Sequence, residues 1–116
     1  MNRNTLPEKM KLAIIVLNRI ELLEDLLSAF FEIDIPDANV IDSVGMKHII
    51  SHDIPIFAGL MDSFTGSSPK SKTIFVRIED EMTQKLIEVV RDICSDPDES
   101  DTGYILFLPI EKSVDF

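Results

Sequence analysis

The sequence of 116 residues contains a single cysteine, Cys94, and no tryptophan. One cysteine excludes an intramolecular disulfide and a cysteine-rich metal cluster, and it is typical of a reducing compartment. Cys94 lies within an apolar helical pattern, so we expect a packed thiol rather than a reactive one.

Basic residues are scarce, with 11 Lys and Arg against 21 Asp and Glu, and the formal net charge is -10. Phosphate backbones repel such a chain, which excludes nucleic acid as an expected partner. No run approaches the roughly 18 apolar residues that span a bilayer. The polar segment 1–10 also lacks the apolar core and cleavage site of a signal peptide. We therefore expect a cytoplasmic protein without membrane insertion.

The remaining composition, 45% hydrophobic and 28% charged, is that of an ordinary globular domain. A chain of this length forms one core and has no room for a second domain. We predict a single domain over residues 1–116, with a flexible tail at 1–10.

The first half of the chain predicts a strand, a helix and a second strand. The aliphatic run 11–17 (KLAIIVL) is typical of a buried strand. Asn18 is a candidate helix cap, and apolar residues then recur at helical spacing until Pro36 ends the helix. Residues 39–44 (NVIDSV) form the second predicted strand.

The second half repeats this order. Residues 73–78 (TIFVRI) predict a strand, and the acids at 79–81 mark the start of a helix, where the helix dipole favours negative charge. An acidic, turn-rich loop, SDPDESDT, covers 95–102. The fourth predicted strand, GYILFLPI, covers 103–110.

Two such units predict an α+β, ferredoxin-like βαββαβ fold. It has a four-stranded antiparallel sheet, two helices on one face and a long loop after the second strand. A doubly wound parallel sheet is the alternative, but two helices are too few to cover both of its faces. The uncovered sheet face needs a partner, and a trimer around a central channel would supply one. The apolar residues that predict this face are Ile14, Val16, Val40, Phe75, Ile105 and Phe107.

The long segment 46–71 has no clear period, and loops of this length are usually functional or disordered. His48 and His52 are four residues apart, so with Asp53 they could hold a metal ion; the alternative is a pair of ordinary loop histidines. The apolar run IPIFAGLM is either a docking patch for a partner or packing against the protein itself. The run TGSSPKS has neither a base beside its serines nor a P-loop pattern, which favours a linker.

Three stretches, VIDSVGM, SPKSKTIFVRIEDE and TGYILFLPIEKSV, resemble the P-II family of nitrogen-regulatory signalling proteins. The resemblance runs from Lys11 to Val114, and it identifies the chain as a divergent, P-II-like relative. It implies a non-enzymatic homotrimer that senses a small molecule in the cleft between subunits. The segment 46–71 corresponds to the T-loop, through which the family acts on an enzyme or transporter.

The resemblance also implies which residues line this cleft, with Thr102 and Gly103 coming from the neighbouring subunit. They are Asn39, Gly45, Met46, Lys47, Lys70, Thr102, Gly103 and Tyr104. A close approach of backbone to ligand would explain Gly45 and Gly103, and Lys70 could neutralise a phosphate.

Other positions depart from the family pattern. Tyr104 stands where the family has a phosphate-binding lysine, and Asp115 stands where nucleotide-binding members have an arginine. Adenine nucleotide remains a candidate ligand, although the phosphate-binding residues are largely missing, and the ligand is otherwise unknown. The segment 46–71 has no tyrosine, so uridylylation is not expected. The alternatives are a metal-binding trimer using His48, His52 and Asp53, and an enzyme at the subunit cleft, which lacks a nucleophile–base pair.

Overall fold

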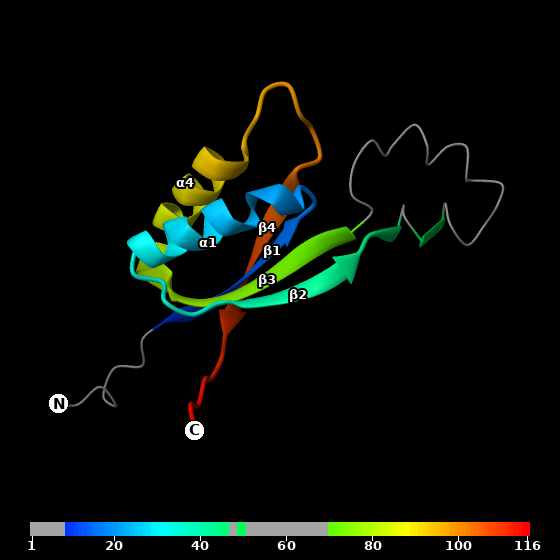
Figure 1. Ribbon diagram of the computed structural model, residues 1–116. Coiled ribbons are helices and arrows are strands. Elements are labelled where there is room, and N and C mark those ends of the chain that lie inside the picture. The colour runs from blue at the N-terminus through cyan, green and yellow to red at the C-terminus, as the bar shows by residue number, and fades with distance from the viewer. Residues whose placement is uncertain (1–8, 47–48, 51–69) are drawn as a thin grey trace.

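The computed structural model describes residues 9–46, 49–50 and 70–116. Its four-stranded sheet has the order β2-β3-β1-β4 and carries helices α1 and α4 on one face (Figure 1). The elements are β1 (Met10–Leu17), α1 (Leu23–Glu32), β2 (Asn39–Val44), β3 (Lys70–Glu79), α4 (Thr83–Cys94) and β4 (Gly103–Ile110). All strand pairings are antiparallel. The predicted ferredoxin-like fold is therefore confirmed, and the parallel alternative is wrong.

The two halves are built alike. A 3-10 turn leads from each of β1 and β3 into the helix that follows, η1 (Ile20–Leu22) in the first half and η3 (Asp80–Met82) in the second. Arg19 occupies the cap position of η1 and makes no capping bond through its side chain. The predicted cap at Asn18 is therefore wrong.

Helix α1 ends before the predicted stop at Pro36. Its last residue is Glu32, and Asp34 then adopts a left-handed conformation with a φ of 66°. The amide of Ile35 donates to the carbonyl of Phe30 at 2.9 Å, and the amide of Asp34 donates to that of Phe31 at 3.2 Å. These two bonds satisfy carbonyls that a helix end leaves open, so they terminate the helix ahead of the proline.

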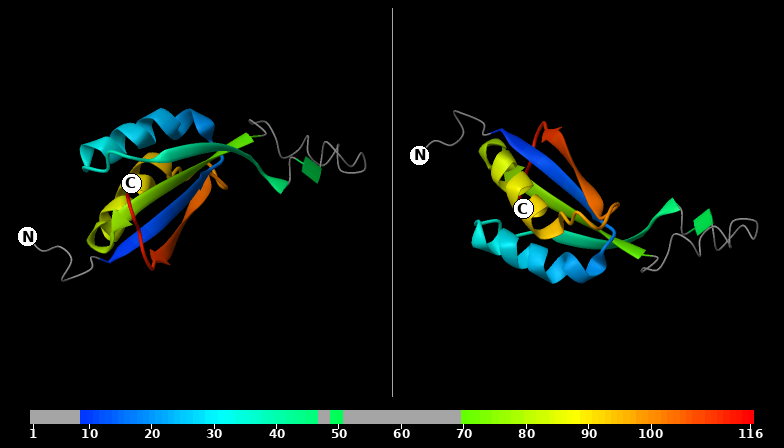
Figure 2. Two further views of the ribbon diagram at one scale, coloured as in Figure 1. Left: turned by 90° about the horizontal axis from the view of Figure 1, so that it is seen from below. Right: turned by 90° about the horizontal axis from the view of Figure 1, so that it is seen from above.

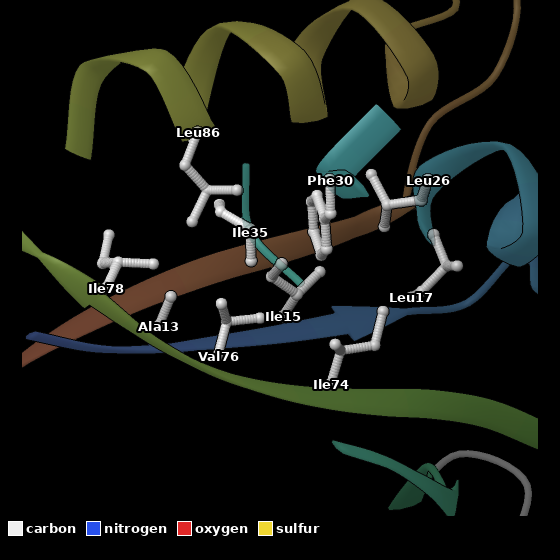
Figure 3. Packing of buried hydrophobic residues seen from close by; sticks show 10 residues of the cluster. All are labelled: Ala13, Ile15, Leu17, Leu26, Phe30, Ile35, Ile74, Val76, Ile78 and Leu86. Carbon is white, nitrogen blue, oxygen red and sulfur yellow. The ribbon is translucent and has the colours of Figure 1, made fainter. Parts of the chain in front are cut away.

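The core lies between the helices and the sheet. Figure 3 shows Phe30 of α1 and Leu86 of α4 pointing toward the strands, with Ile15 of β1 beneath them. The buried apolar side chains are Ala13, Ile15, Leu17, Leu26, Phe30, Ile35, Ile74, Val76, Ile78 and Leu86. On β1 and β3 they occupy every second position, because alternate strand residues point to the same face.

The register assigns the remaining strand residues to the opposite face, which we call the open face. Ile14 lies opposite both Phe75 and Leu106, and Val16 lies opposite Tyr104. Two apolar residues predicted here, Ile105 and Phe107, instead pack against the core. Val40 is likewise misplaced, because it pairs with the buried Ile74. The open face also carries polar residues, and its apolar residues on β1, β3 and β4 include Leu12, Ile14, Val16, Phe75, Tyr104, Leu106 and Leu108.

The strands extend slightly into both segments predicted to be irregular. Met10, assigned to the N-terminal tail, is the first residue of β1, and the end of the segment 46–71 is the beginning of β3. Within the part of the chain that the structure describes, no helix is long and apolar enough to cross a membrane.

Candidate functional site

One end of each of the four strands lies along the same edge of the sheet, which is the edge that runs across the strand ends. Asp42 of β2 pairs with Lys72 of β3, which lies beside Leu17 of β1, and Leu17 in turn pairs with Gly103 of β4. The segment 46–71 leaves β2 and enters β3 at this edge, and the acidic loop 95–102 enters β4 there (Figure 1). We call this edge the loop edge.

Most of the predicted cleft residues that the structure describes lie at the loop edge. They are Gly45, Met46, Lys70, Thr102, Gly103 and Tyr104. Asn39 does not join them, because it is the first residue of β2 and pairs with Phe75. Three residues of extended chain, or about 10 Å, separate it from Asp42. Lys47 lies outside the described residues.

The two predicted ligand-binding glycines differ in their surroundings. Gly103 has a φ of 156°, and a Cβ there would overlap the backbone carbonyl of Val16 on β1. This close approach is to the neighbouring strand, so the fold itself requires glycine at position 103. A Cβ added at Gly45 would meet nothing within 4 Å. Packing is therefore a sufficient reason for glycine at position 103, and its role in ligand binding stays a prediction.

Asn18 holds the acidic loop against the end of β1. Its backbone amide donates to the carbonyl of Thr102 at 2.8 Å, and its side-chain Nδ2 donates to the carbonyl of Asp101 at 3.0 Å. Asp101 has a left-handed φ of 63°. Sequence reasoning missed this role of Asn18, because the contact joins residues 83 positions apart. An amide side chain just after a buried strand was the only available signal.

A cleft of about 570 Å³ lies between the end of α4, the acidic loop and the adjoining ends of β1 and β4. Its floor is apolar, with Ile15, Leu17, Val90 and Ile105, and its rim includes Arg91, Asp96 and Glu99. Its volume lies within the range of small-molecule sites, which combine apolar walls with a few polar groups. Thr102, Gly103 and Tyr104 also line this cleft.

The charges around the cleft disfavour a polyphosphate. The acidic loop carries Asp96, Asp98, Glu99 and Asp101. The amide of Asp98 donates to Oδ1 of Asp96 at 2.9 Å, and the amide of Glu99 donates to the carbonyl of Asp96 at 3.0 Å. These two amides are thus occupied within the loop, whereas phosphate-binding loops direct their amides at the ligand.

Arg19 links the start of the first helical unit to the acidic loop. Its Nε lies 3.0 Å from the Glu21 carboxylate, and its Nη1 lies 3.7 Å from that of Asp96. The pKa of Glu21 is lowered by a hydrogen bond that its carboxylate accepts from its own backbone amide and by the hydrogen bond from Arg19. Burial raises the pKa of the Cys94 thiol, so that it stays protonated near neutral pH. The half-buried Cys94 packs against the core, as predicted.

The base of the segment 46–71 carries polar contacts on both sides of the sheet. On the helix side, Lys72 forms an ion pair with Asp42, and the hydrogen bond from Lys72 lowers the pKa of that carboxyl. On the open side, the hydroxyls of Ser43 and Ser71 lie 2.7 Å apart, and Thr73 donates to Ser43 at 2.8 Å. Sequence reasoning did not find these cross-strand pairs, which fix how β2 and β3 leave the sheet.

The predicted metal ligands His48, His52 and Asp53 lie outside the described residues. Among the residues that the structure describes, no group of three His, Cys, Asp or Glu side chains is arranged to hold a metal ion. The metal-binding alternative therefore stays a prediction.

Solved structures of other proteins share this fold, among them the following two. A functionally unknown protein from Pediococcus pentosaceus ATCC 25745 matches with a TM-score of 0.67 at 16% identity, over 94% of this chain and 99% of that chain. The PII protein of Arabidopsis thaliana, solved bound to citrate, matches with a TM-score of 0.64 at 14% identity, over 89% and 76%. No family model matches the sequence, and no curated protein matches it either. The predicted resemblance to P-II proteins is confirmed at the level of the fold.

Proposed function

We propose that this chain, which has the P-II fold, is a non-enzymatic signalling protein that works as a homotrimer. A small molecule binds in the cleft between neighbouring subunits and sets the conformation of the segment 46–71. That segment then engages a protein partner, an enzyme or transporter, in the cytoplasm. Such control requires a ligand that binds the two conformations of the segment with different affinity.

The loop edge is the observation that carries the proposal. The segment 46–71 departs from the same edge at which the acidic loop and its cleft lie. β2 and β4 are separated by two strands, so Asp42 and Gly103, which lie in one row, are about 14 Å apart at a strand spacing near 4.8 Å, and Gly45 lies three residues beyond Asp42. A small ligand cannot contact both glycines within one subunit. In the proposed trimer, a neighbouring subunit brings the second set of residues to the first.

The open face supports the trimer. Phe75, Tyr104, Leu106 and Leu108 expose apolar side chains there, and the helices cover only the opposite face. Contiguous apolar surface of this kind marks an interaction site, and closed symmetry lets identical copies cover it for one another. Size-exclusion chromatography with light scattering tests this step, and a monomeric protein would contradict it.

The charges of the cleft narrow the choice of ligand. We expect ATP to bind weakly or not at all, because the acidic loop would face its phosphates and opposes them by roughly a kcal/mol for each nearby acid. A less charged molecule that uses the apolar floor fits better. Bicarbonate and citrate are further probes, and citrate is included because the Arabidopsis protein was solved with it.

Calorimetry with ATP, ADP, AMP, cyclic nucleotides, bicarbonate and citrate tests the ligand. A Glu99→Lys variant serves as a matched probe, because it reverses one rim charge on an exposed side chain. If nucleotides bind here, this variant should strengthen the binding of ATP more than that of the less charged cyclic nucleotides. If no adenine nucleotide binds to the wild type or to the Glu99→Lys variant, the nucleotide-sensing version of the proposal is wrong.

A further inference from the structure

The C-terminal residues cross the open face. Beyond β4 the chain continues as residues 111–116, which pass beneath the sheet on the side opposite the helices (Figure 1). Figure 2, in the view from below, shows this segment crossing β1 toward β3. We call residues 111–116 the C-terminal strap.

Arg77 of β3 holds the strap. Its Nη1 donates to Oγ of Ser113 and to Oδ1 of Asp115, each at 2.6 Å. Arg77 lies opposite Leu12, which in turn lies opposite Leu108, so its guanidinium belongs to the open face. Arg77, Leu12 and Leu108 therefore form a row across three strands in which only Arg77 is charged. Asp115 neutralises that charge.

In an isolated subunit this ion pair contributes little to stability. The Arg77 side chain is 42% exposed and that of Asp115 is 80% exposed, so water solvates both charges. Exposed pairs of this kind contribute almost nothing to folding. The pair gains a role only if the open face is covered.

Covering the open face changes the energetics of Arg77. In the proposed trimer each copy brings one guanidinium into the interface, where an unpaired charge is costly. Like charges brought together around a symmetry axis also repel one another. A bound Asp115 removes both penalties.

We infer that the C-terminal strap is part of the surface on which a second copy of this chain docks, with Asp115 neutralising Arg77 inside that interface. The inference rests on the proposed trimer. It also gives Asp115 a role within its own subunit, at a position where nucleotide-binding P-II proteins have an arginine. The strap is thus an assembly element here.

The test compares the concentration at which the assembly dissociates, measured by analytical ultracentrifugation. Asp115→Asn should raise that concentration by about tenfold or more, because it leaves each Arg77 unpaired. Arg77→Leu should leave assembly unchanged or strengthen it, since the remaining Asp115 can turn into water. The double variant Arg77→Leu with Asp115→Asn should then assemble as the wild type does. Asp25→Asn, on the exposed side of α1, is the charge-matched control.

Each outcome decides a different question. A monomeric wild type would overturn the proposed trimer and this inference with it. A trimeric wild type whose Asp115→Asn variant dissociates at the same concentration would overturn the inference alone. Tighter assembly of Asp115→Asn would also overturn it, by showing that the strap obstructs the open face. Circular dichroism and thermal melting of each variant confirm that the subunit itself stays folded.

Discussion

The two faces of the sheet come from the same strands and differ in what covers them. On the helix face, Ile15 and Ile74 are at most 2% exposed, whereas Leu106 and Tyr104 on the open face are 49% and 57% exposed. Both faces of β1 and β4 are largely apolar, because these two strands carry apolar residues at odd and even positions alike. One face is buried by folding alone, and the other would be covered only in the proposed trimer.

This difference predicts which substitutions affect the subunit and which affect the assembly. The expected effects on unfolding are largest where side chains are buried by the chain itself. They are smallest among exposed groups, whose contacts are solvated.

Phe30→Ala should have the largest effect. Phe30 is fully buried between α1 and the sheet, so truncation leaves a cavity and should lower the free energy of unfolding by about 3–5 kcal/mol. Urea denaturation at a fixed protein concentration measures this. Phe31→Ala is the matched control, because the Phe31 side chain is 72% exposed and its loss should change stability by less than about 0.5 kcal/mol.

Gly103→Ala should come next, with a loss of about 2–3 kcal/mol. The new methyl group would overlap the Val16 carbonyl, and the backbone at residue 103 is one that L-residues rarely adopt. Gly45→Ala is the control, because space around it is open. Thermal melting of the two variants compares them directly. Equal stability would contradict the packing explanation for Gly103.

Leu106→Lys should separate folding from assembly. The residue lies on the open face beside Ile14, so a charge there should dissociate the proposed trimer. The stability of the isolated subunit should change by no more than about 0.5 kcal/mol. Light scattering gives the mass, and urea denaturation gives the subunit stability. An unchanged mass would show that the open face is not the interface.

The smallest expected effect is the loss of stability at acidic pH. Hydrogen bonds from Lys72 and Lys11 lower the pKa of Asp42 and Asp80 below their ordinary value of 3.8. Lowered values mean that their stabilisation is present above pH 3.8 and is lost as the pH falls through the lower folded-state pKa. Melting temperature measured from pH 7 to pH 2 should therefore decline at the acidic end.

Asp80→Asn should reduce that decline by removing the ion pair with Lys11, whose atoms lie 2.8 Å apart. The control is Asp25→Asn, because Asp25 forms no ion pair within the described residues. An identical acid profile in the wild type and in Asp80→Asn would show that this pair contributes nothing to the pH dependence.

Local patterns were sufficient to predict the elements and several of their limits. The second and fourth strands were predicted at 39–44 and 103–110, where the structure has β2 and β4. Strand and helix periods depend on neighbours in sequence, and turn residues separate the elements. The order of the elements then left few folds to choose from.

The candidate site was only partly predictable. The glycines, Lys70 and the acidic loop were found, because each lies next to the end of an element in the sequence. Asn18 and the Arg77–Asp115 pair were not, because their contacts join residues distant in sequence. Asn39 was placed with the site only by resemblance, and the register puts it elsewhere along β2.

The sequence by itself determined the elements, their order and the acidic character of the loop beside the cleft. Tertiary structure alone decided which face each strand residue occupies. Ile105 and Phe107 turned out to face the helices, with Leu106 between them on the open face. In a strand that is apolar at every position, a shift of one residue exchanges the two faces without changing the pattern. Only the pairing of β4 with β1 resolves that ambiguity, and it thereby defines the surface left for a partner.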